Sequence, residues 1–209
     1  IVVPYDVTRP VRPIPEAVMR EAYPRAYTYL AGFRDVLEAR PQYTKLAADG
    51  EPFYALYNIG DYTFEGCRVA WRELASTMTV AVVGSQAGKP VVADHKLVTV
   101  TVSSANEAHF LCALLNSSPT RYVVASYAVE VQLGPHIVAR LRIPRFEPSD
   151  RVHRELGGLS ARAHSAAAAA EAEPLADVEA AIDQLAAQLW GLTERELKDI
   201  QDSLADLRS

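Results

Sequence analysis

Apolar positions recur along the chain with two different periods, and the change of period separates predicted helices from predicted strands. Four prolines fall within residues 1–15, which predicts an extended lead-in because proline fixes φ and donates no backbone hydrogen bond. A helix is expected over 24–40, where Tyr27, Leu30 and Leu37 recur at helical spacing and a proline stands in the first turn.

The period shortens to two between residues 68 and 102, which is typical of half-buried strands. The segment LVTVTV at 97–102 alternates strictly, and β-branched residues dominate 77–83. Glycines at both ends of GSQAG predict a turn or short loop over 84–90. Strands are therefore expected over 68–74, 77–83, 91–93 and 97–102, with two shorter ones over 130–134 and 140–143.

Helical periodicity returns at 106–116 and, after Ser118-Pro119, over 118–127. From residue 148 onward the chain is alanine-rich. It predicts one helix over 151–172, a second from Pro174, and a last one opened by the capping box Thr193 to Glu196. The expected fold class is α+β. Residues 1–147 would form a mixed, twisted β-sheet with flanking helices and an N-terminal helical lead-in, and residues 148–209 a C-terminal helical region.

Composition supports a folded, non-membrane protein. Of 209 residues, 49% are hydrophobic and the net charge is only −5, which argues against disorder. The chain has no apolar run approaching the roughly 20 residues of a membrane span, and residues 1–5, which have no basic region before them, are not expected to be a signal peptide. Two cysteines, Cys67 and Cys112, cannot make a disulfide framework or complete a zinc site alone. A reducing cytoplasm is expected, without a membrane partner.

The net charge is concentrated in the tail. Through residue 150 the chain has 15 basic and 15 acidic residues, whereas residues 151–209 have 6 and 11. DNA binding depends on a local basic surface, so the overall acidity does not argue against it in the first part. The acidic tail is not expected to contact DNA.

Common catalytic motifs are missing from the sequence. No G-x-G occurs, so neither a dinucleotide fingerprint nor a phosphate loop is predicted, and neither G-x-S-x-G nor H-E-x-x-H is present. No asparagine precedes a proline, so the Asn-Pro-Pro-aromatic motif of amino-methylating enzymes is missing. The chain is therefore not expected to be an enzyme by itself.

Several segments, taken in order, resemble the C-terminal target-recognition (TaqI-like specificity) domain of bacterial N6-adenine DNA methyltransferases, especially fused type IIG restriction–modification enzymes. The resemblance covers nearly the whole chain. Its segments are YPRAYTYL at 23–30, LEAR at 37–40, FYALYNIG at 53–60, YTF at 62–64, RVAWR at 68–72, DHKL at 94–97, LCALLNS at 111–117, RIPRF at 142–146 and WGLT at 190–193.

This resemblance implies a recognition part and not the catalyst. In the family, such a domain follows the methyl-transfer domain and reads the DNA sequence to be modified, while the other domain flips the adenine. The expected partners are double-stranded DNA and an upstream methyltransferase domain or subunit. S-adenosylmethionine would belong to that missing domain, and no cofactor is expected in this chain.

Eleven residues are candidates for DNA contact because they lie in expected loops or at strand positions with suitable chemistry. Arginine and lysine bind phosphates and guanine, asparagine and glutamine read adenine, and aromatic rings stack on bases. Each also has a structural interpretation: Trp71 and its neighbouring arginines suit a half-buried strand, and the turns could simply face solvent. The candidates are Tyr62, Thr63, Arg68, Arg72, Gln86, Lys89, His95, Lys96, Gln132, His136 and Arg145.

Two other functions remain open at this point. A protein-interaction or assembly module would work, and self-associate, through the leucine stripes of the C-terminal helices. It would leave those stripes exposed and the arginines scattered, whereas a recognition domain would gather its arginines on one face. A small enzyme using His95 or Cys67 would need a closed pocket around either residue.

Overall fold

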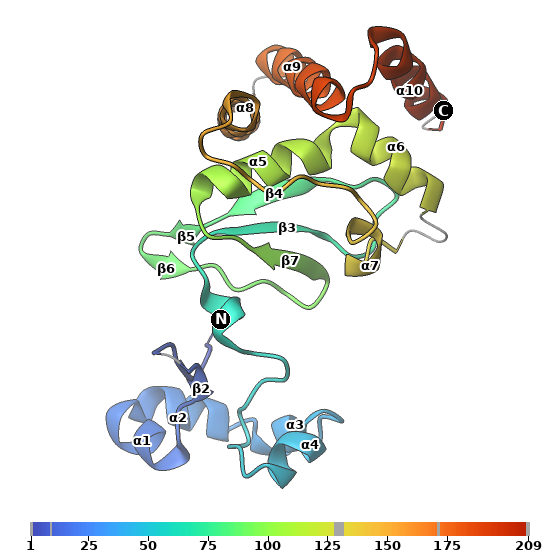
Figure 1. Cartoon of the computed structure of the whole chain (residues 1–209). Helices are drawn as coiled ribbons and strands as arrows, with labels where there is room; N and C mark the ends of the chain where they lie inside the picture. Colours follow the sequence, from blue (N-terminus) through green and yellow to red (C-terminus); the bar gives the residue numbers. More distant parts are fainter. Residues whose placement is uncertain (1, 9, 128–131, 171, 208–209) are drawn as a thin grey trace. The chain divides into compact units, whose positions relative to one another are not determined.

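The computed structural model describes residues 2–8, 10–127, 132–170 and 172–207. Contacts divide the chain into two compact units, Ile1–Glu65 and Gly66–Ser209, which are described separately here (Figure 1). This division does not coincide with the predicted boundary after residue 147, because the C-terminal helices pack within the second unit.

The first unit is mostly helical. Two short strands, β1 (Tyr5–Asp6) and β2 (Arg12–Pro13), pair antiparallel. The single helix expected over 24–40 is divided into α2 (Pro24–Ala31) and α3 (Arg34–Glu38). The other helices of this unit are α1 (Glu16–Ala22), α4 (Tyr43–Ala48) and the 3-10 helix η1 (Asp61–Phe64). The interruption between α2 and α3 falls at Gly32-Phe33, where glycine lowers helix propensity.

Long-range hydrogen bonds join the N-terminal segment of this unit to the segment after α4. The Tyr5 hydroxyl donates to the Leu56 carbonyl (2.8 Å) and accepts from the Leu56 N–H (2.7 Å). The Tyr54 hydroxyl donates to the Ile14 carbonyl at 2.6 Å, and burial raises the pKa of Tyr54 to about 12. Met19, Phe53 and Tyr54 form the buried core of this unit.

The second unit is built on a three-stranded sheet in the order β4–β3–β7. Its strands are β3 (Arg68–Arg72), β4 (Val80–Val83) and β7 (Leu97–Thr101). The α+β fold class is confirmed, but both pairings are antiparallel where a mixed sheet was expected. The strand expected over 91–93 is not formed. The predicted loop over 84–90 is instead a two-stranded hairpin of β5 (Ser85–Gln86) and β6 (Lys89–Pro90).

Helices cover one face of this sheet (Figure 1). Helix α5 (Ala105–Asn116) packs on β3 and β4, and Val69, Trp71 and Val80 meet Cys112 and Leu115 in a buried core. The layer continues outward with α6 (Ser118–Tyr127), α8 (Arg151–Ala169), α9 (Ala172–Trp190) and α10 (Glu194–Asp206).

The last three helices confirm the predicted helical tail. Thr193 and Glu196 form the expected capping box, since the Thr193 side chain accepts from the Glu196 N–H and Glu196 accepts from Thr193. The apolar stripes of α9 and α10 face inward in part: Val178, Ile182 and Leu197 are buried, whereas Leu207 at the end of α10 is 69% exposed.

Of the two short strands predicted beyond residue 129, the one over 140–143 is not formed. Residues 140–143 follow a short helix, α7 (Pro135–Val138), and make no strand. Leu141 and Ile143 pack against the core instead of pairing. Of the strand expected over 130–134, residues 130 and 131 lie outside the described residues, and Gln132 forms an isolated bridge with Leu74.

Candidate nucleic-acid interface

The sheet of the second unit has two chemically different faces. Along β3, Val69 and Trp71 point toward α5, so Arg68, Ala70 and Arg72 point to the opposite face, because side chains alternate along a strand. Strand β7 adds Thr99 and Thr101 as the partners of Ala70 and Arg68 in the register. The face away from α5 therefore carries arginine and threonine, together with Val83 and Leu97, the register partners of Arg68 and Arg72.

One end of this face gathers several of the predicted DNA-binding residues. Arg72 is exposed and pairs with Leu97, which follows Lys96 directly. The Glu73 N–H donates to the Lys96 carbonyl at 2.9 Å, and the bridge between Leu74 and Gln132 brings Gln132 to the same end. We call Arg72, His95, Lys96 and Gln132 the β3-end cluster.

The turn that carries His95 and Lys96 is organised by Asp94. Its Oδ1 accepts from the Lys96 N–H at 3.0 Å and lies 3.1 Å from His95 Nδ1. The His95 side chain is 78% exposed. Asp94 and Glu73 belong to the same segments as the cations Lys96 and Arg72, so acidic and basic residues are equal in number here and this end offers hydrogen-bonding groups more than a strong positive field.

The β5–β6 hairpin extends from the other end of the sheet, where β4 finishes beside Arg68. Residues 84–90 are all exposed and include one lysine, one glutamine and no acidic residue. Gln86 and Lys89 are paired across the hairpin. Ala87 and Gly88 have φ values of 50° and 73°, the positive angles that a tight two-residue turn requires.

Two predicted contact residues are buried, at odds with direct DNA contact. Arg68 is 1% exposed, its Nη2 donates to the Val91 carbonyl, and burial lowers its pKa. Thr63 is 7% exposed, and its Oγ1 accepts from the Gly60 N–H at 3.1 Å. Both side chains hold the backbone of a loop instead of facing solvent.

The remaining predicted residues are exposed. Tyr62 belongs to the first unit, and its hydroxyl donates to the Asn58 carbonyl. His136 lies in α7, four residues beyond Gln132. Arg145 precedes Phe146, which packs on Phe110 among the helices, so Arg145 belongs to the helical side of the unit and not to the β3-end cluster.

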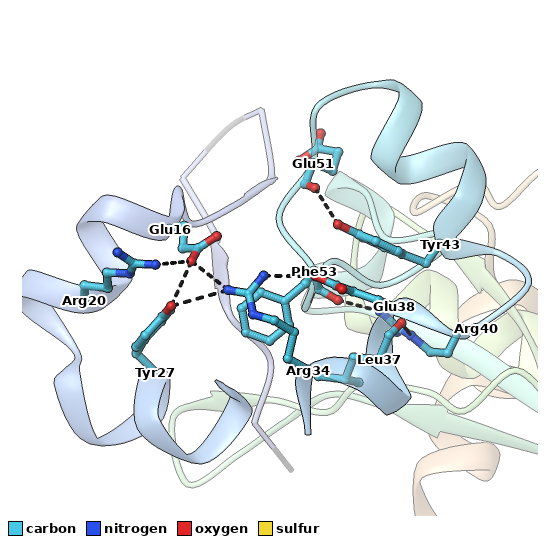
Figure 2. A network of polar contacts seen from close by, with 10 residues as sticks. All are labelled: Glu16, Arg20, Tyr27, Arg34, Leu37, Glu38, Arg40, Tyr43, Glu51 and Phe53. Carbon is cyan, nitrogen blue, oxygen red and sulfur yellow. Dashed lines mark hydrogen bonds and ion pairs between the residues drawn. The ribbon is translucent and has the colours of Figure 1, made fainter. Parts of the chain in front are cut away.

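A polar network in the first unit was missed by the sequence analysis (Figure 2). Glu16 accepts hydrogen bonds from Arg20 (2.6 Å), Arg34 (2.8 Å) and the Tyr27 hydroxyl (2.8 Å). Arg34 also pairs with Glu38 and lies 3.7 Å from the centre of the Phe53 ring. Two arginines and two glutamates balance in charge, so we interpret the network as a structural link between α1, α2 and α3. The spacings Glu16–Arg20 and Arg34–Glu38 could have revealed it.

The two cysteines differ in exposure, and His95 lies on an exposed turn. Cys112 is 1% exposed, and burial raises its pKa to about 11, which disfavours the reactive thiolate. Cys67 is partly exposed. Among the residues that the structure describes, no group of three or more His, Cys, Asp or Glu could hold a metal ion. Within the same residues, no helix is both long and apolar enough to cross a bilayer.

A pocket in the helical layer was also not predicted. It has a volume of about 330 Å³ and is lined by residues from α6, α9, α10 and the segment after α7. No hydrophobic pattern in the sequence could have located it, because its walls come from four separate segments.

No model of a known protein family matches the chain, and no curated protein matches it significantly. The likeness to target-recognition domains therefore rests on the sequence segments alone and stays a prediction.

Proposed function

We propose that this chain recognises duplex DNA, as the target-recognition part of an N6-adenine DNA methyltransferase or a fused restriction–modification enzyme. The supporting observation is the β5–β6 hairpin, which is exposed at every position from 84 to 90 and carries Gln86 and Lys89 without an acidic residue. The major groove of B-DNA admits a two-stranded β-ribbon, and glutamine and lysine are side chains that read base edges there.

The β3-end cluster supports the same proposal by its distance from the hairpin. Strand β3 runs from Arg68, beside the hairpin, to Arg72. At ~3.3 Å per residue that is roughly 13 Å, close to the ~12 Å width of the major groove. With the hairpin in the groove, Arg72 and Lys96 would lie near the phosphates at its edge and set the register.

The proposal divides the work between this chain and a catalytic partner. Reading the target is assigned to the hairpin and the β3-end cluster. Adenine flipping, S-adenosylmethionine binding and methyl transfer are assigned to a methyltransferase domain or subunit outside this chain.

The first test measures binding of the full chain to a random-sequence duplex over a series of salt concentrations. If Arg72 and Lys96 contact phosphates, log K should fall against log salt with a slope of about −2, near −0.9 per contact. Replacing either one by alanine should make the slope shallower by about 1. Lys198→Ala provides the matched control, because Lys198 is exposed on α10 in the acidic tail.

A second test addresses the hairpin backbone. Ala87→Pro cannot adopt a φ of 50°, because proline is restricted to about −65°, whereas Ala87→Gly fits the turn. DNA affinity should fall about tenfold in Ala87→Pro and stay within twofold in Ala87→Gly. Binding that is insensitive to salt, or equal in both turn variants, would contradict the proposal.

A further inference from the structure

The 330 Å³ pocket lies within the second unit, on the helical side of the sheet. Helix α6 provides Tyr122 and Val123, the segment after α7 provides residues 140–142, and Trp190, Leu192 and Ile200 come from the end of α9, the following turn and α10. Helix α10 packs against both α6 and α9, so these walls belong to one packed layer (Figure 1).

The walls are apolar and two arginines are the charged residues among them. Tyr122 and Val123 are 38% and 36% exposed, so the pocket opens to solvent along α6. Its lining residues include Arg140 and Arg142 but no carboxylate. An apolar cavity with a few polar groups of one kind is the usual form of a small-molecule site, and this volume falls at the small end of the range of ~300–1,000 Å³.

Neighbouring contacts hold three of these lining residues. The Arg140 guanidinium lies 5.3 Å from the centre of the Tyr127 ring, next to the exposed face of α6. The Trp190 Nε1 donates to the Arg142 carbonyl at 3.2 Å, which ties the indole wall to the arginine segment. The aromatic wall and the cationic segment are therefore positioned together, before any ligand binds.

We propose that this pocket binds a small organic anion with an apolar body, such as an aryl or short alkyl carboxylate. The apolar body would displace water from Val123, Leu141 and Trp190, and the carboxylate would accept hydrogen bonds from an arginine guanidinium, whose planar donors match its geometry. This site is separate from the proposed DNA-binding hairpin and does not depend on that function.

The test uses phenylbutyrate as the anionic probe and phenylbutanol as its neutral counterpart, titrated into the full chain. Trp190 fluorescence reports occupancy, because the other tryptophan, Trp71, is 2% exposed in the sheet core. Phenylbutyrate should bind saturably and at least tenfold more tightly than phenylbutanol. In the double variant Arg140→Gln/Arg142→Gln, phenylbutyrate should lose that advantage while phenylbutanol binds as before.

Two further variants locate the site. Arg195→Gln removes an exposed arginine of α10 outside the pocket lining and should leave phenylbutyrate affinity unchanged. Val123→Trp should fill the pocket and abolish binding of both probes, with an unchanged far-ultraviolet circular dichroism spectrum. Equal affinity for both probes, full phenylbutyrate affinity in the double arginine variant or in Val123→Trp, or no saturable binding would each overturn the proposal.

Discussion

Asp183 links three helices of the second unit, so its removal should destabilise that unit strongly. The carboxylate, 9% exposed on α9, accepts from the Ser118 N–H (2.7 Å) and the Ser118 hydroxyl (2.5 Å) at the start of α6. It also accepts from Gln201 Nε2 of α10 at 2.9 Å. Asp183 thus satisfies a free N–H at a helix start, where negative charge is favourable.

The size of the effect follows from these three bonds. A hydrogen bond to a charged group contributes about 1.5–3 kcal/mol, and a buried donor left without its acceptor costs about 1–3 kcal/mol, but bonds to one carboxylate are not additive. We expect Asp183→Ala to lower the free energy of unfolding by about 3 kcal/mol. Asp183→Asn keeps an acceptor oxygen and should cost about half as much.

Urea unfolding followed by tryptophan fluorescence measures this directly, because both tryptophans, Trp71 and Trp190, belong to the second unit. Glu179→Ala is the control: Glu179 is exposed on the same helix, and its loss should change stability by no more than ~0.5 kcal/mol. A double-mutant cycle with Gln201→Ala should give a coupling of about 1 kcal/mol. A cost below 1 kcal/mol for Asp183→Ala would show that the carboxylate does not hold the helices together.

Three more predictions follow from pKa shifts. Burial, with a contribution from His164, lowers the pKa of His109 from 6.5, so the unfolded state binds a proton at this residue before the folded state does as pH falls. The free energy of unfolding of the second unit should therefore drop below pH 6.5. Urea titrations at several pH values should show a flatter dependence on pH in His109→Gln. The Tyr27 hydrogen bond, aided by Arg20 and Arg34, lowers the pKa of Glu16 from 4.5, so the stabilisation that the Glu16 carboxylate provides should be lost as pH falls below 4.5. Hydrogen exchange of the α1 amides should become faster over that pH range in the wild type but not in Glu16→Gln. Because burial raises the pKa of Cys112, a thiol reagent followed by peptide mass spectrometry should label Cys67 in the native chain and Cys112 only in urea; native labelling of Cys112 would contradict its burial.

The long periodic segments could be predicted from sequence because local patterns determine them. The alternation around Trp71 and over 97–102 marks the strands β3 and β7, and side-chain caps mark two helix starts: Asp150 accepts from the His153 N–H at 3.0 Å, and Thr193 opens α10. In each case the signal lies within a few residues of the element that it predicts.

The elements that were missed depend on distant partners. Helix α3 has only five residues, too few to be stable alone, and Arg40 at its end donates to the Phe53 and Ala55 carbonyls. Arg68 was expected to face DNA, but a carbonyl 23 residues away accepts its hydrogen bond and buries it. The candidate residues follow the same rule: most of those expected in turns are exposed, whereas Thr63 is buried by a hydrogen bond from the Gly60 N–H, and the exposure of a strand arginine depends on which loop covers it.

The two criteria that separate a recognition domain from an assembly module give different answers here. The leucine stripe of α9 is not an exposed surface, because Ile182 is buried against α5 and α8, whereas the stripe of α10 runs from Leu197, 8% exposed, to Leu207, 69% exposed. The arginines of the second unit are not gathered on one face either: Arg68 is buried, Arg72 ends β3 and Arg142 lines the helical pocket. An assembly function that used these stripes would therefore have the end of α10 as its exposed part. A recognition function needs few cations if a hairpin enters the groove, since base-edge contacts then supply specificity and one or two phosphate contacts set the register. The exposed hairpin is thus the feature on which the functional assignment depends.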